Sequence, residues 1–163
     1  MTKIITINQL IEMFKTFSEK HFQLNDFGYG PTSEIGKSRD MKFPYLWITH
    51  SQNSTITINS RNQVPTLNLT FIVVDQINDQ KNYLNTNGND SNNIQEIMSD
   101  TFQTIQDLIH YCLVNLGKMG IKILEEQMNI NPIMDETTDK VSGWSIDLTL
   151  QLMHLNCVTP ITL

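Results

Sequence analysis

The chain has 163 residues, of which 39% are hydrophobic and 17% are charged, and its formal net charge is −6. This length suits one domain, and the composition excludes a disordered chain. No apolar run approaches the length of a membrane span. An acidic chain with scattered Lys and Arg residues binds the phosphates of a DNA backbone poorly. We therefore expect a single domain over residues 1–163 with no membrane segment and no specific DNA binding.

The first residues point to a protein that stays in the cell that makes it. Met1–Asn8 has only a short apolar patch and lacks the sustained apolar region of a secretory signal. Cys112 and Cys157 lie far apart, and a reducing compartment keeps both as thiols, so we expect no disulfide.

A helix is predicted from Ile7. Leu10, Phe14 and Phe17 recur at three- and four-residue steps, and Thr6 and Gln9 have the spacing of a capping box. The segment Asn25–Pro31 holds two glycines and a proline, which predicts the end of the helix and a turn.

Three strands are predicted next, at Phe43–His50, Thr55–Asn59 and Thr66–Asp75. The first is apolar on both faces in its middle, and the other two alternate with period two. Because short loops join them, we expect an antiparallel meander.

A long polar loop is predicted at 76–93, with Asn87-Gly88-Asn89-Asp90 at its centre. It has many oxygen ligands, but its glycine is misplaced for an EF-hand and the closing glutamate is absent. Ser91 is expected to cap a helix with one broad apolar face, which ends at Gly117.

The remaining predicted elements are strands at Ile121–Met128 and Gly143–Leu155, joined by a polar connector that contains Pro132. In the last strand, apolar residues from Trp144 onward alternate with polar ones, as in a sheet with one buried and one wet face. The expected fold class is α+β, an antiparallel sheet of about five strands with two helices packed on one face.

No catalytic or metal site is expected. His154 and Cys157 supply only one ligand pair, and His110 and Cys112 point about 200° apart on a helix. Cys112 lies on the apolar stripe, where a thiol is usually inert.

Templates for nucleophilic catalysis and nucleotide binding also fail. The segment Gly143-Trp144-Ser145-Ile146 lacks the second glycine of a nucleophile elbow, and Gly28-Tyr29-Gly30 does not open a helix. We expect no enzyme activity, no catalytic residue, no cofactor and no bound metal.

The aromatic residues fall into two groups. Trp47 and Trp144 lie at inward-compatible strand positions and are expected in the core. Tyr29 sits between two glycines and is less easily explained by burial, so we single it out as a contact residue.

The chain resembles the small tail-completion or neck-ring proteins of crAss-like phages and other phages that infect Bacteroidetes. The likeness spans nearly the whole chain and rests on the order and spacing of several segments. These are Phe27-Gly28-Tyr29-Gly30, Phe43-Pro44-Tyr45-Leu46-Trp47, Val73-Val74-Asp75, Met98-Ser99-Asp100-Thr101-Phe102-Gln103, Gly143-Trp144-Ser145-Ile146-Asp147-Leu148 and Asn156-Cys157-Val158-Thr159-Pro160.

This resemblance implies a tail-terminator-like fold in a hexameric or dodecameric ring, stacked on portal, neck or tail proteins. The protein would be made in the host cytoplasm and reside in the virion, and DNA would pass through the ring without specific binding. Contacts are expected from Glu34–Lys42, Gln76–Asn93, Asn129–Lys140 and Asn156–Leu163. The individual interface residues are Tyr29, Asn87, Asp90, Asp135, Glu136 and Pro160.

The alternative is a small non-enzymatic adaptor that binds a host or phage protein. An adaptor needs one exposed apolar patch, whereas a ring subunit needs two different complementary surfaces.

Overall fold

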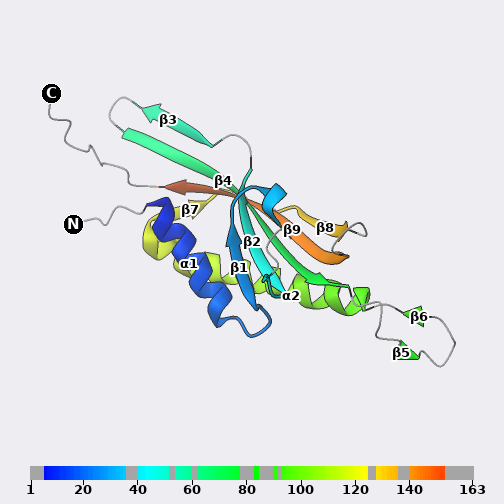
Figure 1. The fold of residues 1–163 in the computed structure, drawn as a ribbon. Coiled ribbons are helices and arrows are strands. Elements are labelled where there is room, and N and C mark those ends of the chain that lie inside the picture. Colours follow the sequence, from blue (N-terminus) through cyan, green and yellow to red (C-terminus); the bar gives the residue numbers. More distant parts are fainter. Residues whose placement is uncertain are drawn as a thin grey trace.

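The computed structural model describes residues 6–35, 40–51, 54–59, 62–77, 83–84, 90–91, 93–124, 128–135 and 140–152. In this part of the chain a mixed seven-stranded sheet carries two helices (Figure 1). The helices are α1 (Ile7–Lys20) and α2 (Ile94–Asn115), with short 3-10 helices η1 (Thr32–Glu34) and η2 (Gly117–Met119). The strands are β1 (Asp26–Tyr29), β2 (Tyr45–His50), β3 (Thr55–Asn59), β4 (Asn62–Gln76), β5 (Tyr83–Leu84), β6 (Asp90–Ser91), β7 (Ile121–Ile123), β8 (Ile130–Asp135) and β9 (Val141–Leu152).

Helix α1 begins where the sequence predicts it. The Thr6 hydroxyl accepts from the backbone N–H of Gln9 at 3.2 Å, and the Gln9 side chain accepts from the Thr6 N–H at 3.0 Å. This reciprocal pair is the predicted capping box. Leu10, Phe14 and Phe17 are buried against the sheet, so the predicted apolar face is confirmed.

Strand β1 lies within the segment that the sequence analysis assigned to a turn. It pairs in parallel with β2, with Phe27 opposite Leu46, so the prediction of a purely antiparallel sheet is wrong. Parallel neighbours need a crossover connection. Residues 30–44, between β1 and β2, supply it, and we call them the crossover segment; it contains η1, Met41 and Phe43.

The three predicted central strands do not form a meander. Both β2 and β3 pair with the same edge of β4, β2 with residues 69–74 and β3 with residues 62–66. Ser51 continues this ladder through its N–H to the Asn68 carbonyl at 3.1 Å. Strand β4 begins at Asn62, earlier than predicted, and is long enough to pair with both β2 and β3. The result is one long hairpin, with β2 and β3 on one side and β4 on the other.

Strand β9 pairs with β4 along its length, from Gln151 opposite Thr66 to Val141 opposite Gln76. Strands β7 and β8 both pair with the other edge of β9. Strand β8 lies in the segment predicted as a polar connector. Pro132 is compatible with this position because edge strands tolerate a residue without an N–H. The predicted strand Ile121–Met128 is shorter and ends at Ile123. The two strands that were not predicted, β1 and β8, raise the count in the sheet from about five to seven.

The predicted long loop contains a small two-stranded ribbon. Tyr83 pairs with Ser91 and Leu84 with Asp90. Ser91 therefore belongs to a strand and does not cap α2, whose N-cap is Asn93. At the other end of α2, Leu116 is the C-cap and the left-handed glycine is Gly120, not Gly117.

The main core lies between the helices and one face of the sheet, as predicted. It includes an edge-on contact between the Phe14 and Phe71 rings, whose centroids are 4.7 Å apart. The opposite face is not wet throughout. A second buried cluster lies at one end of that face, because the crossover segment packs on it: Tyr45, Trp47, Ile72, Val74 and Val141, with Ile35, Met41, Phe43 and Ile133 against them.

Candidate functional site

The predicted interface residues are only partly described by the structure. Tyr29 is an exposed residue at the end of β1. Asp90 and Asp135 lie in β6 and β8, where the backbone alone is described. Asn87, Glu136 and Pro160 lie outside the described residues. Tyr29 is therefore the one of these six residues whose side chain the structure describes.

Tyr29 has a partner on the neighbouring strand. Its hydroxyl lies 2.5 Å from Nε2 of His50, and the two rings meet edge-on with centroids 5.6 Å apart. Because His50 is also exposed, this pair forms a polar aromatic spot at the sheet surface. That Tyr29 is a contact residue stays a prediction.

Of the two His–Cys pairs considered as metal ligands, His154 and Cys157 lie outside the described residues, and the other pair is split by α2. His110 is exposed on α2 while Cys112 is fully buried, so the two face different sides of the helix. Burial raises the pKa of the Cys112 thiol to about 12, which keeps it protonated and poorly nucleophilic. Within the described ranges, no group of three His, Cys, Asp or Glu side chains could hold a metal ion.

Polar contacts join the two helices, and in one of them the Tyr111 hydroxyl on α2 donates to the Met13 carbonyl on α1 at 3.5 Å. His21 Nε2, at the end of α1, lies 3.2 Å from Asp107 Oδ2 on α2, and Gln103 donates to the other Asp107 oxygen at 3.2 Å. Nearby, the rings of Tyr111 and Phe17 lie tilted at 45° with centroids 5.0 Å apart, and burial raises the pKa of the Tyr111 hydroxyl, with a smaller contribution from Cys112. These contacts hold the two helices together.

Two apolar surfaces stand out instead, and the first is an arm. We use this name for β3 together with the paired residues 62–66 of β4. The arm reaches beyond the last β4–β9 pair, Thr66–Gln151, and extends from the body of the sheet (Figure 1). Ile56 and Ile58 on β3 are 63% and 76% exposed.

The arm isoleucines share a face with core residues of β4. Ile56 pairs with Pro65, and Leu67, two residues further along β4, is buried in the main core. Directly opposed residues in an antiparallel pair point to the same side, as do residues two apart on a strand. The arm therefore continues the core face of the sheet past the point where helices cover it.

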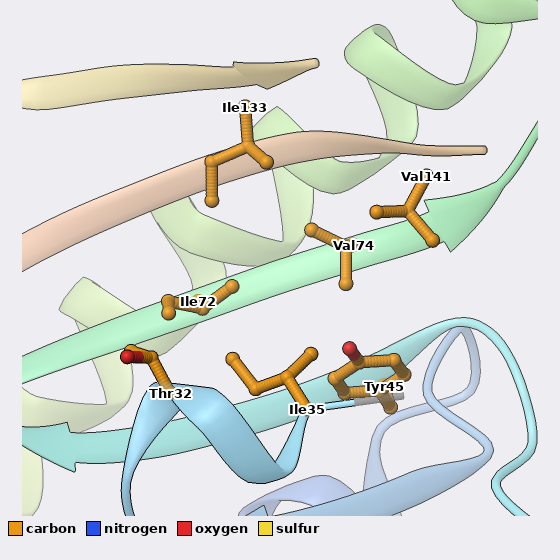
Figure 2. A pocket seen from close by; sticks show the side chains of 7 residues that line it. All are labelled: Thr32, Ile35, Tyr45, Ile72, Val74, Ile133 and Val141. Atoms are coloured by element: carbon orange, nitrogen blue, oxygen red, sulfur yellow. The ribbon is translucent and has the colours of Figure 1, made fainter. Parts of the chain in front are cut away.

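The second surface is a cavity of about 280 Å³ on the opposite face, which we call the outer pocket. In Figure 2 its side chains converge on the face of β4 turned away from α2. The floor comes from the sheet and one wall from the crossover segment. The lining residues are Thr32, Ile35, Tyr45, Ile72, Val74, Ile133 and Val141.

The arm and the outer pocket lie at opposite ends of β4. Pro65 belongs to the arm and Val74 lines the pocket, and Val74 lies nine positions after Pro65 on the same continuous strand. At about 3.4 Å per residue this is roughly 30 Å. Sequence reasoning found the strands but not these surfaces, because an alternating strand has the same pattern whether its apolar face is covered or exposed.

Comparison with protein-family models gives no match, and a search of curated proteins finds no relative. The likeness to tail-completion and neck proteins thus remains a prediction. None of the helices in the described ranges is long and apolar enough to cross a membrane.

Proposed function

We propose that this chain is a structural subunit of a phage virion that assembles into a ring in the neck or tail and completes the connection between head and tail. The observation that carries the proposal is the presence of two unlike apolar surfaces on one chain, the arm and the outer pocket. The arm exposes two neighbouring isoleucines, and the pocket is an aliphatic cavity that could receive such side chains.

Two different surfaces favour a ring over a simple dimer. A twofold dimer uses the same patch on both subunits, whereas a ring joins one surface of each subunit to a different surface of the next. The separation of roughly 30 Å along a continuous strand prevents one chain from bringing its own arm to its own pocket. Each copy can therefore offer one surface to each of two neighbours.

The charge of the chain fits a channel through which DNA passes. The net charge is −6, and Asp147 is exposed on the polar part of the outer sheet face, beside Thr70. A surface with this charge gives DNA no multiple cationic contacts to hold it. The resemblance to neck and tail-completion proteins supports the same function, with six or twelve subunits per ring and portal, neck or tail proteins as stacked neighbours.

The test is the mass of the purified protein, measured by native mass spectrometry and light scattering. The protein is examined alone and then mixed with the neighbouring head and tail proteins. A closed species of six or twelve copies, seen as rings by electron microscopy, is the expected result. A monomer under both conditions would overturn the proposal and leave the adaptor as the better explanation.

A further inference from the structure

We propose that the arm of one copy inserts Ile56 and Ile58 into the outer pocket of the next copy, so that a second copy of this chain is the occupant of that pocket. This contact rests on the proposed ring and names the two surfaces that build it. It is a heterologous contact, since the donor and acceptor surfaces are different.

The arm has the form of an inserting element. Ile56 and Ile58 stand two residues apart on the same face of β3, so their Cα atoms are separated by about 7 Å. Thr57, between them, points to the opposite face. The arm therefore presents a pair of branched aliphatic side chains on one side and a polar side chain on the other.

The outer pocket matches this pair in size and polarity. A cavity of about 150 Å³ holds one benzene-sized group, so the 280 Å³ here suits two aliphatic side chains. Five of its seven lining residues are Ile or Val. Only Thr32 and Tyr45 bring side-chain oxygens to this lining, so most of its surface suits an aliphatic occupant.

A second copy accounts for both surfaces at once. The same chain carries an exposed aliphatic pair and an aliphatic cavity of matching capacity, and a continuous strand holds them at opposite ends of the sheet. A partner of another kind would fill one surface and leave the other exposed. Repeating the arm-to-pocket contact uses both surfaces of every subunit.

Two variants test the two halves of the contact, each with a matched control. Ile58→Asp places a charge on the inserting face, and its control Thr57→Asp places it on the other face of the same strand. Ile133→Asp places a charge in the pocket wall, and its control Ile133→Val keeps an aliphatic side chain at the same position. We expect the midpoint concentration for ring assembly to rise at least tenfold in both test variants and to stay near the wild-type value in both controls.

The decisive measurement is a mixture of Ile58→Asp with Ile133→Asp, followed by native mass spectrometry. The first variant keeps an intact pocket and the second keeps an intact arm. One arm-to-pocket contact remains between them, so the mixture should form a dimer of one copy of each and nothing larger. Such a dimer also shows that both variants are folded.

The results distinguish a failure of the arm-to-pocket contact from a failure of the proposed ring. If the wild-type protein forms rings and Ile58→Asp forms them equally well, the contact is wrong while the proposed function stands. If both variants lose assembly but their mixture gives no dimer, the contact is again overturned. If the wild-type protein never assembles, alone or with its neighbours, the proposed function fails and the contact fails with it.

Discussion

The indole ring of Trp47 lies directly against the backbone of Gly28 on the neighbouring parallel strand. The two residues are in register, and a Cβ added at position 28 would lie 2.1 Å from the Trp47 Cε3 atom. The Trp47 Nε1–H also donates to the Gly30 carbonyl at 3.0 Å. An aromatic side chain thus covers a glycine in an adjacent strand, and this contact holds β1 on the sheet.

The first prediction concerns this contact. Gly28→Ala should lower the free energy of unfolding by about 1–3 kcal/mol, because the added methyl group forces the indole ring or the strand to move. Gly117→Ala is the control, since nothing lies within 4 Å of a Cβ at that position. Urea unfolding followed by tryptophan fluorescence measures both, and equal stability of the two variants would contradict the packing described here.

The capping box of α1 gives a second prediction. Thr6→Ala removes the acceptor for the Gln9 N–H and should cost about 1 kcal/mol of stability. Thr6→Ser keeps a hydroxyl and should stay within about 0.5 kcal/mol of the wild type. Thermal unfolding monitored by circular dichroism compares them, and a loss of the same size in the serine variant would show that the hydroxyl is not what matters.

Cys112 should resist thiol reagents in the folded protein. Its side chain is fully buried and its pKa is raised to about 12, so at pH 8 the thiolate fraction is about a thousandfold smaller than for an ordinary cysteine. The measurement uses Cys157→Ser, which leaves a single thiol. Labelling by a chromogenic disulfide reagent should be slow in buffer and immediate in denaturant, and fast labelling in buffer would contradict the burial.

The same thiol predicts a loss of stability at alkaline pH. The unfolded chain releases the Cys112 proton near pH 9, while the folded protein holds it to about pH 12. The unfolded state therefore binds fewer protons in this window, and the free energy of unfolding falls by up to about 1.4 kcal/mol per pH unit.

Cys112→Ala isolates this effect from other alkaline titrations. The stability difference between wild type and Cys112→Ala should shrink as the pH rises from 9 to 11 in urea titrations. A difference that stays constant across this range would show that the thiol titrates normally in the folded state.

Predictions from local sequence patterns are correct where the physical cause of the structure is itself local. The capping box at Thr6, the apolar face of α1 and the alternation along β9 depend on neighbours within one or two turns of the same element. The expectation of a buried Cys112 follows from the same kind of pattern on α2.

Predictions from local patterns failed where a strand is held by residues that lie far away in the sequence. Asp26–Tyr29 has the composition of a turn, yet Trp47 and the crossover segment hold it as a parallel strand. Pro132 marks a connector by composition, yet the free edge of β9 accepts the segment around it as a strand.

By itself, the sequence determined the α+β class, the position of both helices and most of the central strands, because periodicity and capping are properties of short segments. Only the tertiary structure decided which strands share an edge of β4, and therefore that β3 extends past the helices as an arm. It also decided that the crossover segment covers one end of the outer face and forms the outer pocket. Both surfaces depend on contacts between distant segments, and the side-chain pattern of a single strand carries no record of what covers it.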